Sequence, residues 1–405
     1  MIDSGDRGRG CYEFFAGGGM ARLGLGPEWT PLFANDICPK KAKSYVRNFP
    51  PGNEFSSGDI RDLDLQDLPG NPTLAWASFP CQDLSLAGAR GGLKGKRSST
   101  FWSFWELMEG MERQGRPLPI IVLENVVGAI TSNRGEDFQT IVSTLAKSGY
   151  GVGPMVIDSG LFLPQSRPRL FVAAVKEDRM DFSALSESGP KHPWHTPALL
   201  RVFENLPNAL RKHWIWWRLP HPGPKDIGLS DLIDKDMADG VRWHTEEETQ
   251  RILNMMSPAN RQKVVESSEK GNLQVGAIYR RTRKDSEGRS VQRAEVRFDE
   301  MSGCLRTPAG GSSRQTLLFV EGDTIRSRLL SPREAARLMG VPEWYQLPEN
   351  YNEAYHLMGD GVVVPVVSWL EKHLLRPLSR GIAESTHAMD LEREGSDSMP
   401  SAKAV

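Results

Sequence analysis

A cysteine that directly follows a proline is the first candidate for chemistry. Cys81 stands in Phe79-Pro80-Cys81-Gln82, just beyond residues 74–78, which we expect to form a strand. A strand end would hold the thiol rigidly and exposed, where it could act as a nucleophile. Because a free thiol has a pKa of about 8.5, a neighbouring group must stabilise the thiolate or take its proton. The alternative is a small buried hydrophobic residue, the more frequent role of a lone cysteine.

A carboxyl group and two arginines could assist that nucleophile. Glu124 ends the expected strand over residues 120–124, and Arg167 and Arg169 stand before another strand. One reaction that needs groups of these kinds is the addition of a thiolate to C6 of a cytosine ring, which makes C5 of that ring reactive. A buried carboxyl group of raised pKa could protonate N3, and an arginine could donate to O2. Taken singly, these groups have ordinary interpretations as a carboxylate at a helix N-terminus and a basic surface pair.

A glycine-rich loop, Phe15-Ala16-Gly17-Gly18-Gly19, follows an expected first strand. Glycines allow a tight turn and a close approach of the backbone to a ligand. Asp36 ends the next strand and could accept hydrogen bonds from ribose hydroxyls, and Asp59 could face an adenine amino group. The spacing suits an adenosine-containing ligand. The alternative is a plain turn with two aspartates that cap helices.

The order and content of these motifs resemble the DNA (cytosine-5) methyltransferase family, of bacterial or phage type. Gln165-x-Arg167-x-Arg169 belongs to the same series, residues 328–342 look like the family's ninth motif, and residues 355–370 look like its tenth. The resemblance covers about residues 11–375 and leaves out a variable region at about 178–290. So many collinear motifs make it specific.

The resemblance implies transfer of a methyl group from S-adenosyl-L-methionine to C5 of cytosine in a specific sequence of double-stranded DNA. It implies base flipping and a covalent bond between Cys81 and C6. Glu124 would act at N3 and Arg169 at O2, and the other supporting residues would be Pro80, Asn125 and Arg167.

The resemblance also assigns the binding residues. Those expected at the cofactor are Phe15, Ala16, Gly17, Gly19, Asp36, Ile37, Asp59, Ile60, Pro80, Asp360 and Val362. Those expected at DNA are Ser85, Arg90, Arg97, Gln165, Arg280, Arg281 and Arg283. Three positions depart from the family: Phe79 stands where proline is frequent, Ile37 where an aromatic often stacks on adenine, and Asp360 where asparagine is common. Asp360 could alter cofactor affinity.

The elements that must position these residues alternate between strand-like and helix-like segments. This alternation predicts an α/β fold with a mostly parallel sheet, in which ligands bind beyond the carboxyl ends of the strands. The resemblance makes it a Rossmann-like S-adenosylmethionine-dependent methyltransferase fold with a smaller target-recognition domain. We expect a catalytic and cofactor-binding domain at 1–177 and 346–378, the target-recognition domain at 178–345, and a disordered tail at 379–405. Trp214, Trp216 and Trp217 would pack in the core of the smaller domain.

Composition sets wider limits. The chain has 405 residues and a formal net charge of −1, so a polyanionic partner requires a local basic face. The four cysteines, Cys11, Cys38, Cys81 and Cys304, lack zinc-site spacing, so no metal is expected. The sequence shows neither an apolar run long enough to span a membrane nor a signal peptide. We therefore expect a protein that stays inside the cell. The resemblance to the family implies the bacterial cytosol or nucleoid, a monomer, and a cognate restriction endonuclease as a possible partner.

Parts of the sequence are compatible with three other functions. A tRNA cytosine-5 methyltransferase would share the fold, but the Cys-Phe-Thr tripeptide expected of it is absent. A non-catalytic binding protein with a degenerate fold is disfavoured by the intact Cys81, Glu124 and Arg169. A dinucleotide oxidoreductase would explain only the glycine-rich loop.

Overall fold

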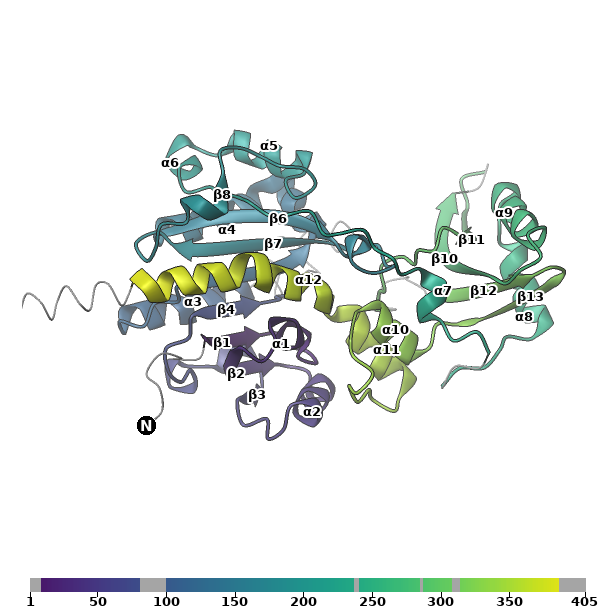
Figure 1. Ribbon diagram of the computed structural model, residues 1–405, viewed down its shortest axis with the longest axis horizontal. Helices are drawn as coiled ribbons and strands as arrows, with labels where there is room; N and C mark the ends of the chain where they lie inside the picture. The colour runs from purple at the N-terminus through teal and green to yellow at the C-terminus, as the bar shows by residue number, and fades with distance from the viewer. Residues whose placement is uncertain (1–8, 81–99, 237–239, 285–286, 308–313, 386–405) are drawn as a thin grey trace, which may run out of the picture.

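A seven-stranded sheet forms the larger part of the molecule (Figure 1). The computed structural model describes residues 9–80, 100–236, 240–284, 287–307 and 314–385. The strands run in the spatial order β3 (Phe55–Ser57), β2 (Trp29–Asp36), β1 (Arg9–Phe14), β4 (Leu74–Ala77), β5 (Ile120–Val126), β7 (Pro168–Lys176) and β6 (Tyr150–Asp158). β7 pairs antiparallel with β5 and β6, and the other neighbours pair in parallel. The carboxyl ends of β1, β2, β4 and β5 therefore meet at one edge, where β7 begins.

Helices cover both faces of this sheet because successive strand residues point to opposite sides. Ile120 and Val122 of β5 pack with α1 (Met20–Leu25) and α12 (Val364–Leu370). Ile121 and Leu123 pack with α3 (Thr100–Arg113) and α4 (Glu136–Lys147). α2 (Pro39–Asn48) follows β2 at the edge of the sheet. The expected α/β architecture with a mostly parallel sheet is confirmed.

A second, four-stranded antiparallel sheet lies to the right in Figure 1, in the order β11 (Ser290–Arg297), β10 (Gln274–Lys284), β12 (Thr316–Glu321) and β13 (Thr324–Leu329). One of its faces packs against α8 (Glu246–Asn254) and α9 (Pro258–Ser268). α10 (Pro332–Leu338) and α11 (Tyr351–Asp360) lie between the two sheets (Figure 1). None of the helices in the described ranges combines the length and apolarity that a bilayer crossing requires.

The boundary expected at residue 178 needs correction. The elements β8 (Ser186–Glu187), α5 (Pro197–Asn205), α6 (Asn208–Arg211) and β9 (Trp216–Trp217) pack with the large sheet rather than the small one (Figure 1). The Val152 amide of β6 donates to the His213 carbonyl at 2.7 Å. Trp214, Trp216 and Trp217 are buried as expected, but in the core of the large domain. We therefore place the start of the small domain after residue 217, before α7 (Leu229–Leu232).

The expected start of the tail also needs correction, because residues 379–385 are helical. Leu378 and Ile382 are buried against the large sheet. The rest of the segment expected to be disordered, residues 386–405, lies outside the described residues.

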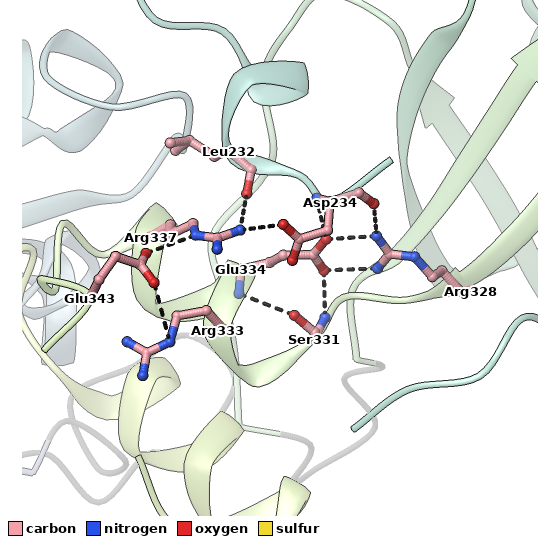
Figure 2. Close-up of polar contacts among 8 residues, drawn as sticks. All are labelled: Leu232, Asp234, Arg328, Ser331, Arg333, Glu334, Arg337 and Glu343. Carbon is pink, nitrogen blue, oxygen red and sulfur yellow. Dashed lines mark hydrogen bonds and ion pairs between the residues drawn. The ribbon is translucent and has the colours of Figure 1, made fainter. Parts of the chain in front are cut away.

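The two chain connections to the small domain meet at a buried ion pair (Figure 2). Arg328, in β13, donates to both carboxylate oxygens of Glu334, in α10, at 2.8 and 2.6 Å. The same carboxylate accepts from the Asp234 amide at 2.9 Å and the Ser331 amide at 2.7 Å. Asp234 follows α7 on the way to the small sheet, and Ser331 lies on the way out of that sheet, so Glu334 ties both segments together.

We expect Glu334→Ala to lower the free energy of unfolding by about 3–5 kcal/mol, because it leaves the buried Arg328 without its counter-charge. The matched control is Glu343→Ala: Glu343 pairs with Arg337 at 2.8 Å in the same network, but its side chain is 63% exposed. Loss of this exposed pair should lower stability by at most about 1 kcal/mol. Urea denaturation measures both values, and equal losses would contradict a dominant role for the buried pair.

Candidate active site

A pocket of about 590 Å³ opens at the carboxyl edge of the large sheet. Its lining includes residues from the ends of β1, β2, β4 and β5, from the start of β7, and from α11. The structure thus brings together most of the predicted residues: Phe15, Ala16, Gly17, Asp36, Ile37, Asp59, Ile60, Pro80, Glu124, Asn125, Arg167, Arg169, Asp360 and Val362. Gly19 is the one predicted cofactor residue that does not line the pocket.

The glycine-rich loop is fixed by Asp36. Its carboxylate accepts from the Gly17 amide at 2.9 Å and from the Cys38 amide at 2.8 Å. Gly17 has φ +58° and Gly19 has φ +78°, which glycine adopts without strain. A Cβ on Gly19 would also clash with the ring of Phe49. Asp36 therefore shapes the loop as well as lining the pocket, a role that the sequence did not predict.

Ile37 and Asp59 lie on the walls of the same pocket. Ile37 is 61% exposed, so an apolar side chain is available to a flat ligand. Asp59 caps the short helix over residues 60–62 by accepting from the Arg61 amide at 3.0 Å, and it also pairs with the Arg61 guanidinium. Asp59 therefore caps a helix, which was the alternative that the sequence left open, and it also lines the pocket.

The unusual Asp360 is paired. Its carboxylate lies 2.9 Å from the Lys41 ammonium and accepts from the Thr307 hydroxyl. Although burial opposes it, the Lys41 charge holds the pKa of Asp360 below its ordinary value. Lys41, which also lines the pocket, was missed because no local motif marks it. The extra negative charge is therefore compensated within the protein.

Glu13 is a second residue that the sequence analysis missed. It lines the pocket from β1 and is 3% exposed. Burial raises the pKa of its carboxyl group to about 8, although Arg22 opposes the shift. A carboxyl group between the apolar residues Tyr12 and Phe14 was the available signal.

The raised pKa of Glu13 makes stability depend on pH. Above the ordinary pKa of about 4.5 the unfolded chain loses this proton, whereas the folded chain keeps it up to about pH 8. Stability should therefore fall between these values, by up to about 1.4 kcal/mol per pH unit. Glu13→Gln keeps the shape and should flatten that slope in urea denaturation. An unchanged slope would contradict a neutral Glu13, and Glu106→Gln, at an exposed position of α3, is the matched control.

The other half of the pocket holds the predicted catalytic groups. Glu124 Oε1 lies 3.3 Å from Arg169 Nε. Burial raises the pKa of the Glu124 carboxyl group, against the opposing charges of Arg169 and Arg167. The Asn125 amide donates to the Phe79 carbonyl at 3.3 Å, next to Pro80. The pocket therefore combines a carboxyl group of raised pKa with a neighbouring guanidinium.

Arg167 has a role inside the protein. It is 2% exposed and donates to the carbonyls of Leu305, Gly359 and Gly361 at 2.7–2.8 Å. It also donates to the Cys304 sulfur at 3.2 Å. These contacts agree with the expectation that it orients neighbouring groups, and its burial leaves it unable to reach a DNA backbone.

The predicted DNA contact at Gln165 is corrected by the structure. Gln165 is completely buried, donates to the Leu338 carbonyl at 2.7 Å, and accepts from the Leu305 amide at 3.2 Å. It therefore joins the large domain to the segment that leaves the small sheet, and no atom of it is available to DNA.

The basic residues of β10 differ among themselves. Arg281 and Arg283 are exposed, and both pair with Glu295 of β11, at 3.6 and 2.6 Å. Arg280 points to the opposite face of the strand and is partly buried. The remaining predicted residues, Cys81, Ser85, Arg90 and Arg97, lie outside the described residues.

Comparison with known proteins agrees with this geometry. The family model for C-5 cytosine-specific DNA methylase matches residues 10–376. Type II methyltransferase M.HgiCI of Herpetosiphon aurantiacus is 24% identical over 88% of this chain and 95% of its own length. Type II methyltransferase M1.ScrFI of Lactococcus lactis subsp. cremoris is 25% identical over 91% of this chain and 78% of its own length. The crystal structure of S. pombe Dnmt2 methyltransferase superposes with a TM-score of 0.56 at 17% identity, over 91% of this chain and 99% of that chain, which shows a shared fold.

Proposed function

Because the chain belongs to the C-5 cytosine-specific DNA methylase family and is therefore a DNA cytosine-5 methyltransferase, we propose that it methylates cytosine within one short sequence of double-stranded DNA. We propose S-adenosyl-L-methionine as the methyl donor, base flipping as the route to the pocket, and Cys81 as the nucleophile. The observation that carries this proposal is the single pocket that joins the glycine-rich loop to Pro80, Glu124 and Arg169.

The residues of the pocket fit the proposed cofactor. Asp36 and Asp59 place carboxylates in its lining, which suits a ligand with ribose hydroxyls and an adenine amino group. The exposed side chain of Ile37 offers an apolar surface for adenine. Bound S-adenosyl-L-methionine would supply an electrophilic methyl group.

The protein's own groups would act on the base. A duplex hides the target carbon, so the cytosine must leave the stack to reach Glu124 and Arg169. The sulfur of Cys81 would form a bond to C6 while Glu124 holds a proton at N3 and Arg169 donates to O2. After C5 has accepted the methyl group, loss of the C5 proton would break the sulfur–carbon bond and restore the thiolate.

Arg167 and Asn125 would keep these groups in place. Arg167 donates to the carbonyls of Leu305 and Gly359, and Asn125 donates to the backbone carbonyl just before Pro80. Neither side chain needs to touch the base. Because these side chains already hold the catalytic groups in position, little rearrangement is needed during the reaction, and its barrier is lower.

The small sheet is the proposed DNA reader. Tyr279, Arg281 and Arg283 share one face of β10, because side chains alternate along a strand. Exposed arginines there can contact phosphates or guanine edges. Their pairing with Glu295 would hold the guanidiniums in fixed directions before DNA binds.

The experiment is to incubate the purified protein with tritiated S-adenosyl-L-methionine and unmethylated plasmid DNA, and then to sequence the DNA after bisulfite treatment. We expect 5-methylcytosine confined to one short motif. Incorporation into bulk tRNA but not into plasmid DNA would contradict the proposed substrate.

We further propose a cognate restriction endonuclease as partner, because the relatives are named Type II methyltransferases. An endonuclease encoded beside this chain should fail to cut plasmid that the protein has methylated. Cleavage of fully methylated plasmid would contradict the pairing.

A further inference from the structure

Cys304 lies against the two arginines of the proposed active site, although no motif points to it. Its sulfur accepts from Arg167 Nη1 at 3.2 Å, lies 3.9 Å from Arg169 Nη2, and in its thiol form donates to the Leu305 carbonyl at 3.4 Å. The side chain is partly buried. A cysteine in an apolar core would have no such partners, so this position calls for a chemical explanation.

The backbone around Cys304 is held on both sides. The Ser302 amide donates to the Pro164 carbonyl at 2.8 Å, and the Ser166 amide donates to the Ser302 carbonyl at 3.0 Å. The Leu305 amide donates to the side chain of Gln165 at 3.2 Å. Gly303 lies directly against the ring of Tyr279, where a Cβ would clash. These contacts fix the backbone on both sides of Cys304, so the fold holds this residue beside the two arginines.

The charges around the sulfur are predominantly positive. Burial raises the pKa of the Cys304 thiol, but the positive charges of Arg167, Arg169 and Arg306 outweigh burial, so its pKa lies below the ordinary value. Glu124 faces the cluster from β5, and the Tyr355 hydroxyl of α11 accepts a hydrogen bond from the Gln315 amide. Two guanidiniums at hydrogen-bonding range thus favour the thiolate.

Arg169 consequently lies between two acidic groups. Its Nε is 3.3 Å from Glu124, and its Nη2 is 3.9 Å from the Cys304 sulfur. A negative sulfur beside the guanidinium reduces the net positive potential that reaches Glu124. The carboxyl group then keeps its proton to higher pH than it would beside an uncompensated arginine.

We propose that Cys304 is a positioning residue whose thiolate orients Arg169 and, through it, keeps Glu124 in the protonated form that N3 of the base requires. This inference rests on the proposed role of Glu124 as the acid. It differs from a packing role, in which only the volume of the side chain would matter. It also differs from a second nucleophile, because Cys304 would act only through Arg169.

The test is the pH dependence of kcat and KM for DNA in Cys304→Ala, Cys304→Ser and Cys304→Asp, at saturating cofactor. The rate should fall as pH rises through the pKa of Glu124, since the protonated form is the active one. Without the thiolate, Arg169 stabilises the Glu124 carboxylate more strongly, so this fall should move to lower pH by about 0.5–1 unit. KM should stay within about two-fold, since Cys304 does not touch the substrate.

The three variants separate charge from shape. Serine retains a hydrogen-bond acceptor without the charge, so it should shift the profile as alanine does. Aspartate restores a fixed negative charge and should return the fall toward the wild-type pH. Cys11→Ala is the matched control, because this buried thiol of β1 has no place in the pocket and should leave the profile unshifted.

A uniform loss of rate at every pH in all three variants would show a packing role and overturn the inference. So would a profile identical to that of the wild-type enzyme. Failure of the proposed function looks different: the wild-type protein itself would then transfer no methyl group to DNA.

Discussion

Cys81→Ser should abolish methyl transfer to DNA while DNA binding remains measurable. A hydroxyl group ionises far less readily than a thiol, so the variant lacks the nucleophile that must add to C6. Removing the nucleophile from a cooperating set of groups lowers kcat by up to about 10⁶-fold in well-studied enzymes. Tritium transfer at saturating cofactor measures the rate, and a gel-shift titration measures binding.

Cys11→Ser is the matched control for this prediction. It makes the same chemical change at a buried cysteine of β1 that lies outside the pocket. Any fall in the activity of Cys11→Ser should match the fall in its folded fraction, which circular dichroism measures. A near wild-type rate for Cys81→Ser would place the nucleophile elsewhere.

Glu124→Gln should lower kcat by about 10²- to 10⁴-fold, the usual contribution of a general acid. The amide keeps the size of the side chain, but it cannot give up a proton to N3. KM for DNA should change little, because the lost interaction is made mainly in the transition state. The variant should also lose the fall in rate at high pH, since the titrating group is gone.

The matched control is Glu106→Gln, at an exposed position of α3 outside the pocket. Its rate should equal that of the wild-type enzyme at every pH. If Glu124→Gln retained most of the wild-type kcat, proton donation at N3 would have to come from another group.

Much of the pocket could be predicted from the sequence because its residues follow strands. Asp36, Glu124 and Pro80 each stand at the carboxyl end of a segment with a clear strand pattern. In a parallel sheet those ends meet at one edge, so an order of motifs along the chain becomes a cluster in space. The fold class could be predicted because strand-like and helix-like segments alternate along the chain.

The domain boundary was harder because residues 183–228 have no clear periodicity. Rich in proline, tryptophan and histidine, this segment was assigned to the small domain by composition. In the structure its tryptophans bury against β6 and β7 of the large sheet. Which of two cores an aromatic residue joins depends on long-range packing, which composition does not report.

The missed residues act through partners distant in sequence. Gln165 bonds to backbone groups of Leu305 and Leu338, so its burial could not be seen from its own motif. Lys41 reaches Asp360, and Cys304 reaches Arg167. Such pairs form only when the chain returns from the small domain to the edge of the large sheet.

The most direct test of the covalent mechanism uses a DNA fragment that the protein methylates, prepared again with 5-fluorocytosine in place of cytosine. Fluorine cannot leave C5 as the proton does, so the thiolate cannot be expelled and the complex should persist. We expect a cofactor-dependent adduct that survives denaturation, and mass spectrometry should place the DNA on the peptide that contains Cys81. An adduct on another residue would contradict the proposed mechanism. The absence of any adduct on a fragment whose ordinary form the protein methylates would also contradict it.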